Sequence, residues 1–147
     1  MSDWVIKGVF TNLTPAEKWF FLRHPHLIDE AFAARDEAFA TTRRHFPGAR
    51  AHNDSADAFR HAYFSALLAR DMGVDNAQEL TDAHEAYGDN PAGERQMDLA
   101  NNAVGIRIGG ANPNGSNVRL QNEVLAELNA GRLMTRVPTP GQAYSAY

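Results

Sequence analysis

The sequence predicts an all-α fold: a compact single domain of about six helices around a central buried helix at about residues 55–71. Three observations lead to this prediction. The 147 residues are the size of one domain with its own core. Helix start and stop signals recur along the chain, whereas the alternation that marks β-strands is nearly absent. The segment 56–69 is apolar almost all the way round, which is typical of a helix in the centre of a domain.

Proline, glycine and capping residues delimit the first two predicted helices. The run TPAE at residues 14–17 combines an N-cap, a proline at the first helical position and a capping-box glutamate. The helix that starts there is expected to end near His24, because Pro25 disfavours helical geometry in the residue before it. A second helix is expected over about residues 27–45, since the helix-ending run FPG follows at 46–48.

Similar signals delimit the remaining helices. Asp54 or Ser55 is predicted to cap the third helix, and Asp75 the fourth. The dipeptide NP at residues 90–91 predicts the start of the fifth. Glycines end these three helices at about residues 73, 88 and 109.

The last predicted helix and the segment after it set the expected domain limits. A sixth helix is expected over about residues 117–129, with Gly131 as its C-cap. We expect one all-α domain over residues 1–136 and a proline-rich, extended tail over residues 137–147.

Composition excludes several classes of protein. The chain has no cysteine, which excludes disulfides, a thiol nucleophile and cysteine-ligated metal sites. No apolar run approaches the ~18 residues of a membrane span, and the first residues lack the features of a secretory signal. No glycine-rich nucleotide-binding motif occurs, so no nucleotide cofactor is expected. The net charge of −4 ranks nucleic acid last among the substrates considered.

The predicted central helix carries polar residues that stability alone does not explain. Asp57, His61 and Ser65 follow one another at i, i+4 spacing, and Arg60 lies beside them. Burying such groups costs free energy unless each finds a partner, and alanine or leucine would avoid that cost. The stripe therefore indicates a functional site, although a structural network that satisfies itself remains an alternative.

The fourth and fifth predicted helices repeat this pattern. His84 continues the inward apolar stripe of the fourth helix, and Glu85 lies at the edge of that stripe. On the fifth helix, Asp98, Asn102 and Gly105 fall on one face at i, i+4 and i+7. A glycine inside a helix costs about 1 kcal/mol relative to alanine. Close approach of a substrate and a tight helix crossing explain Gly105 equally well.

The third, fourth and fifth predicted helices are expected to bring these polar residues towards one cavity, where they could support two kinds of chemistry. A divalent ion (Zn²⁺, Ca²⁺ or Mg²⁺) on His61, His84 and Asp98 would activate a water molecule. Without a metal, His61 or His84 would act as general base, oriented by Asp57 or Asp98. The predicted catalytic residues are Asp57, Arg60, His61, His84, Glu85 and Asp98. The predicted substrate-binding residues are Asn53, Asn101 and Asn102.

Three segments in order carry a resemblance to a known family. They are NDSADAFRHA at residues 53–62, DAHE at 82–85 and MDLANNAVG at 97–105, the series NxxxDAxRHA…DAHE…MDxxNNxxG. The series resembles a bacterial domain of unknown function found at the C-termini of polymorphic toxins of the Rhs and type VI kinds, over about residues 12–109. In that family a histidine often precedes the paired asparagines, where this chain has Ala100. The resemblance implies an antibacterial effector and a cognate immunity protein.

The expected function is therefore that of a toxin domain acting as a hydrolase, with metal assistance, on a phosphoester, ester or amide bond. The expected substrate is a cell-envelope molecule, a phospholipid or a peptidoglycan precursor. The alternatives are a non-enzymatic binding or adaptor module and a metal-dependent nuclease. The expected partners are the immunity protein, a secretion system or larger toxin scaffold, and a membrane surface. Synthesis in the bacterial cytoplasm and export by a specialised secretion system are expected.

Overall fold

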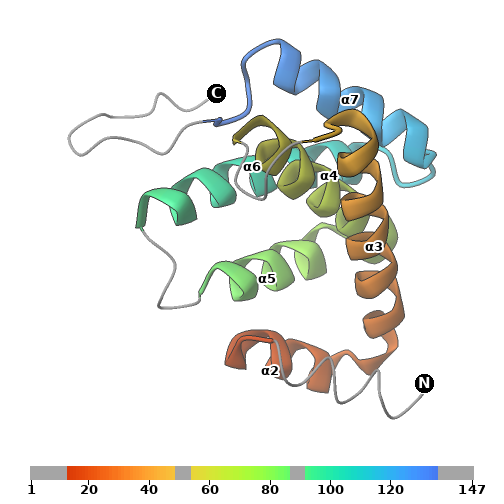
Figure 1. Cartoon of the computed structure of the whole chain (residues 1–147). Coiled ribbons are helices and arrows are strands. Elements are labelled where there is room, and N and C mark those ends of the chain that lie inside the picture. Colours follow the sequence, from red (N-terminus) through yellow and green to blue (C-terminus); the bar gives the residue numbers. More distant parts are fainter. Residues whose placement is uncertain (1–12, 49–53, 87–91, 136–147) are drawn as a thin grey trace.

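The computed structural model describes residues 13–48, 54–86 and 92–135, and within these ranges it is all-α, with no strand (Figure 1). Six α-helices and one 3₁₀ turn, Pro25–Leu27, make up this part of the chain. In chain order the helices are α2 Pro15–Arg23, α3 Ile28–His45, α4 Asp54–Met72, α5 Val74–Glu85, α6 Ala92–Ala111 and α7 Asn117–Asn129. The predicted fold class is confirmed, while the predicted tail and Asn53 lie outside the described residues.

Helix α4 is the centre of the fold, as the sequence predicts. It packs against α3, α5, α6 and α7, and α6 is its most extensive neighbour. Phe59, Tyr63 and Leu67 on one face and Ala58, Ala62 and Leu68 on other sides of this helix are 0–1% exposed. A helix with an apolar circumference therefore places its polar residues in the interior, where they must find partners.

The helix limits lie near the predicted ones, with three differences. Asp54 or Ser55 was predicted to cap α4, but both lie inside the helix; α5 ends at Glu85 rather than near residue 88; and α5 starts differently.

Asp75 was predicted to cap α5, but the helix begins at Val74 and Gly73 is its N-cap. Gly73 has a φ of +88°, which an L side chain rarely adopts. Its N–H donates to the carbonyl of Ala69, and its own carbonyl accepts from Ala77. One glycine thus ends α4 and starts α5, a turn tighter than the predicted cap allows.

Glycines allow the backbones of α4 and α6 to touch. A Cβ atom added to Gly105 would lie 2.0 Å from the carbonyl oxygen of Ala62, and one added to Gly109 would lie 2.1 Å from that of Ala66. Both distances are far below van der Waals contact. A tight helix crossing, one of the two explanations for Gly105, is therefore observed, and it fixes how α4 and α6 face each other.

The segment after α7 is held against α6 by Asn101. Ala130 is the C-cap of α7, and the predicted cap Gly131 follows it at φ +75°. The N–H groups of Gly131 and Arg132 donate back to the carbonyls of Leu128 and Glu127. The fully buried Asn101 side chain then donates to the carbonyl of Met134 at 2.9 Å and accepts from its N–H at 2.8 Å.

Replacement of Asn101 by alanine is expected to lower the free energy of unfolding by about 2–4 kcal/mol, because two buried backbone groups of Met134 lose their partner. Urea denaturation measures the loss. The control Asn122→Ala, at an exposed position of α7, is expected to stay within about 0.5 kcal/mol. A loss for Asn101→Ala as small as that of the control would show that these two bonds do not hold the segment.

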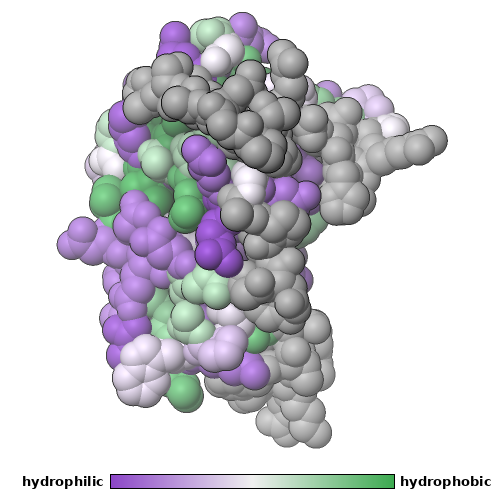
Figure 2. Space-filling model, turned by 90° about the vertical axis from the view of Figure 1, so that its left-hand side faces the viewer, coloured by the Kyte–Doolittle hydropathy of each residue, from purple (hydrophilic) through white to green (hydrophobic). Residues whose placement is uncertain are grey.

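The described surface gives no sign of a membrane span. None of the described helices is both long enough and apolar enough to cross a bilayer. On the face shown in Figure 2, hydrophobic surface lies in separate areas between hydrophilic side chains.

Candidate functional site

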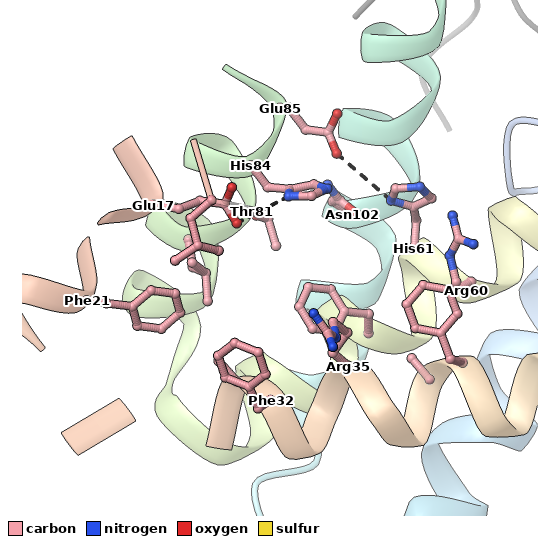
Figure 3. A pocket seen from close by; sticks show the side chains of 16 residues that line it. Glu17, Phe21, Phe32, Arg35, Arg60, His61, Thr81, His84, Glu85 and Asn102 are labelled. Atoms are coloured by element: carbon pink, nitrogen blue, oxygen red, sulfur yellow. Dashed lines mark hydrogen bonds and ion pairs between the residues drawn. The ribbon is translucent and has the colours of Figure 1, made fainter. Parts of the chain in front are cut away.

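A cavity of about 310 Å³ opens between α2, α3, α4 and α5, with one residue from α6 (Figure 3). This volume is at the lower end of the range for small-molecule sites. The polar part of its wall is formed by Glu17, Arg60, His61, His84, Glu85 and Asn102. The apolar part is formed by Leu13, Phe21, Phe32, Phe39, Phe64 and Leu80.

The cavity connects buried polar groups with solvent. Glu85 and Asn102 are each 3% exposed. The side chain of His84 is 56% exposed, and Phe39 is 41% exposed. A ligand can therefore reach the buried polar groups from outside.

His61, Glu85 and Asp98 come together from three helices, α4, α5 and α6. One ring nitrogen of His61, Nδ1, lies 3.9 Å from Oε1 of Glu85, and the other, Nε2, lies 3.4 Å from Oδ1 of Asp98. One ligand atom from each residue lies within 4.8 Å of the others. The group differs from the predicted metal set in having Glu85 in place of His84. His61 and Glu85 line the cavity, and Asp98 adjoins them.

The imidazole of His61 is neutral near pH 7. Burial lowers its pKa, the positive charges of Arg60 and His84 lower it further, and hydrogen bonding to Asn102 opposes them, with a result of about 3. A neutral imidazole keeps a lone pair, which metal binding and general-base catalysis both need.

The two carboxyl groups of the site are difficult to ionise together. Burial, with the negative charges of Glu85 and Asp57, raises the pKa of Asp98 to about 7, while Arg60 opposes the rise. Burial also raises the pKa of Glu85, against His84 and a hydrogen bond from Asn102. A cation bound between these carboxylates would offset their repulsion and favour the ionised forms of both.

Glu17 holds the second histidine of the site. Its Oε2 lies 3.2 Å from Nδ1 of His84, while its Oε1 accepts from the N–H of Thr14 in the predicted capping box. The hydroxyl of Thr14 also donates to the carbonyl of Ala83, which ties the start of α2 to α5. The sequence identified Glu17 only as a capping residue, because nothing local indicates that α2 packs on α5.

In metal-free protein, Glu17→Gln is expected to lower the pKa of His84. The hydrogen bond to Glu17 raises that pKa, burial opposes it, and the charges of Glu17, Glu85 and Asp98 raise it further. Glutamine keeps an oxygen for the capping box but loses the charge that stabilises the imidazolium. NMR titration of the His84 ring measures the change. Glu79→Gln, which breaks only the exposed pair with Arg23, is the control.

Asn102 lies beneath the site and connects α6 to α4. Its Oδ1 accepts from the hydroxyl of Ser65 at 3.0 Å, and both side chains are buried. Its side chain also hydrogen bonds to His61 and Glu85. Two residues of the predicted polar stripe of α4 therefore have different roles. Ser65 orients Asn102, while His61 lines the cavity.

Other predicted residues lie in different surroundings. The guanidinium of Arg60 lines the cavity and lies 3.3 Å from Asp57, which is outside the cavity wall. Asn101 does not line the cavity, because it faces Met134. Arg35 and the aromatic residues of the wall were not predicted. On a helix surface they have the ordinary pattern of an amphipathic helix, so no local signal marks them.

Residues 18–132 match the model of a family described as "Domain of unknown function (DUF6973)". The match covers His61, His84, Glu85 and Asp98, the residues grouped at the polar end of the site. No solved structure matches the chain. Because the match extends over most of its length, the chain belongs to the family described as "Domain of unknown function (DUF6973)".

Proposed function

We propose that this domain is a metal-dependent hydrolase that cleaves a phosphoester, ester or amide bond in a cell-envelope molecule. The observation that carries the proposal is the group of His61, Glu85 and Asp98 at a cavity open to solvent, with the pair His84–Glu17 beside it.

Two of the three ligands have the spacing that a divalent ion needs. Two ligands bound at about 2.0–2.1 Å to a tetrahedral zinc ion lie roughly 3.4 Å apart. The separation of Nε2 of His61 and Oδ1 of Asp98 is 3.4 Å. Oε1 of Glu85 lies 3.9 Å from Nδ1, the other ring nitrogen of His61, so the Glu85 side chain must move to share an ion bound at Nε2. An imidazole ligand favours Zn²⁺ over Ca²⁺ and Mg²⁺, which prefer oxygen. Three protein ligands would leave one position for water or substrate, as in catalytic zinc sites.

Hydrolysis needs only water, a place for its proton and stabilisation of negative charge. A divalent ion, when bound, supplies a water molecule with a pKa near about 7 and polarises the scissile bond. His84, whose pKa Glu17 raises, would donate a proton to the leaving oxygen or nitrogen, and the proton of the attacking water would pass to solvent. The new bond joins the water oxygen to the reacting carbon or phosphorus, and the bond to the leaving group breaks. Arg60 lies where it can stabilise the developing negative charge.

The cavity favours this reading over a purely structural network. A network that serves only to fix packing would be closed, whereas the buried carboxylate of Glu85 lines about 310 Å³ of accessible space. The net charge of −4 keeps nucleic acid last among the substrates.

A panel of substrates tests the proposal. Purified protein with added Zn²⁺ is assayed on a 4-nitrophenyl phosphodiester, 4-nitrophenyl esters, phosphatidylglycerol vesicles, lipid-linked peptidoglycan precursor and single-stranded DNA. Hydrolysis of an envelope substrate is expected, with loss of at least about 100-fold in His61→Ala. His26→Ala, at an exposed position of the 3₁₀ turn, serves as the matched control. Equal activity of His61→Ala and wild type would refute the assigned site, and cleavage of DNA alone would favour the nuclease alternative.

We also propose that the domain acts as an antibacterial effector, which the resemblance to toxin C-termini supports. Production of the wild-type chain in a bacterium, with an added export signal, is expected to stop growth. The His61→Ala chain at equal abundance is expected to be harmless, while His26→Ala stays toxic. Equal growth of cells that make the wild-type and His61→Ala chains would contradict the effector role.

A further inference from the structure

We infer that the substrate of this site is an anionic amphiphile with one apolar chain of medium length and a phosphate head. The inference rests on the proposed function, since it names the substrate class of the same cavity. It comes from the two parts of the cavity wall that the hydrolytic residues do not use.

The first part is an aromatic wall opposite the polar residues. Phe21 and Phe32 lie across the cavity from Glu85 and His61 (Figure 3). Phe39 and Phe64 complete this wall together with Leu13 and Leu80. Apolar surface in contact with water favours an apolar ligand that removes it from water. Since water occupies about 30 Å³ per molecule, the cavity has room for on the order of ten groups of that size, the scale of a medium-length acyl chain.

The second part is a pair of arginines stacked on this wall. The guanidinium carbon of Arg35 lies 5.0 Å from the ring centroid of Phe32, and that of Arg60 lies 4.8 Å from the ring centroid of Phe39. Stacking orients each guanidinium. Arg60 is also paired with Asp57 through Nη2 at 3.3 Å, and its other N–H groups remain for oxygen ligands. The ion pair of Arg35 with Asp36, at 3.8 Å between two exposed side chains, is weak.

The positions of the two arginines indicate how the amphiphile is oriented in the cavity. Arg60 lies beside His61, and in the view of Figure 3 Arg35 lies between Phe32 and Arg60. A phosphate held between the two guanidiniums would therefore lie next to the hydrolytic residues, and a chain attached to it would extend along the aromatic wall. The bond to be cut would adjoin the head group rather than the end of the chain.

Binding of alkyl phosphates tests this substrate class without requiring catalysis. Butyl, octyl and dodecyl phosphate are titrated into the protein by calorimetry, each below the concentration at which it forms micelles. Affinity is expected to rise by up to about fourfold per methylene group until the cavity is filled. Dodecyltrimethylammonium, with the same chain and the opposite charge, is expected to bind at least about tenfold more weakly than dodecyl phosphate.

Matched variants connect each part of the ligand to its part of the wall. Phe32→Ala is expected to reduce the gain from butyl to dodecyl phosphate, whereas Phe46→Ala, a partly buried residue outside the cavity wall, is not. Arg35→Gln is expected to weaken dodecyl phosphate about tenfold. Arg43→Gln, at an exposed position of the same helix, is expected to leave it unchanged.

The outcomes separate this inference from the proposed function. Equal binding of butyl and dodecyl phosphate, or of the cationic and anionic amphiphiles, would overturn the inference whether or not the protein hydrolyses ester bonds. Chain-dependent and charge-dependent binding that Phe32→Ala and Arg35→Gln weaken would support it. If the same protein bound no metal and cleaved no bond, the proposed hydrolase would fall while the amphiphile site would stand.

Discussion

His61→Ala and Asp98→Asn are each expected to weaken Zn²⁺ binding by more than about 100-fold, because loss of a residue that only orients a ligand already costs 10–100-fold. His61→Ala removes Nε2 from the closest contact of the group, the 3.4 Å between Nε2 and Oδ1, and Asp98→Asn removes the negative charge on the other side of that contact. Calorimetric titration of metal-free protein with Zn²⁺ measures the loss.

The same variants separate a metal site from a structural network. Burial lowers the pKa of His61, with help from Arg60 and His84, so the imidazole is neutral and holds no strong ion pair in the free protein. His61→Ala is therefore expected to cost no more than about 2 kcal/mol of unfolding free energy. His26→Ala is again the control for zinc affinity. A large loss of stability together with wild-type zinc affinity would show that the group serves packing alone.

Gly105→Ala is expected to destabilise the fold by about 3 kcal/mol or more and to weaken Zn²⁺ binding with it. The new methyl group would lie 2.0 Å from the backbone oxygen of Ala62, so α4 and α6 must move apart. His61 precedes Ala62, and Asp98 lies on the same helix as Gly105, so this movement separates two of the three ligands. Thermal unfolding and zinc titration measure the two effects.

The control for this prediction is Gly110→Ala on the same helix. Its added methyl group would meet a side-chain methyl of Val74, which is 45% exposed and can move into solvent. A loss below about 1 kcal/mol and unchanged zinc affinity are expected. If Gly105→Ala were as stable as the wild type, the close crossing of α4 and α6 would not hold the site together.

The helices were predictable because their signals are local. The residues of segment 14–17 form a capping box among themselves, and Gly131 adopts the positive φ that glycine favours after a helix. The start of α5 was predicted wrongly because Gly73 serves two helices at once, and only the packing of α4 on α5 shows this.

The site was predictable in part. Polar residues on apolar helices identified His61, Asp98 and Asn102, because their inward position follows from helical periodicity. Periodicity does not distinguish Asn101 from Asn102 as a site residue, since both are buried and only the packing of the segment around Met134 on α6 separates them. Periodicity also does not show which residues of different helices come into contact.

Contacts that depend on helix crossings could not be read from the sequence. Glu85 lies at the edge of the apolar stripe of α5, and its approach to His61 depends on the angle between α4 and α5. Glu17 and Arg35 reach the cavity only because α2 and α3 lie along it. Such angles are set by the shapes of whole helix surfaces.

Location of the ion in the folded protein tests the central claim most directly. Crystals grown with Zn²⁺ and measured at the zinc absorption edge give an anomalous difference map. The metal-dependent hydrolase predicts one peak at about 2.0–2.2 Å from a ring nitrogen of His61 and a carboxylate oxygen of Asp98, with Glu85 completing the ligand set. Zinc bound only at surface histidines such as His24 and His26, with none at His61, would contradict it.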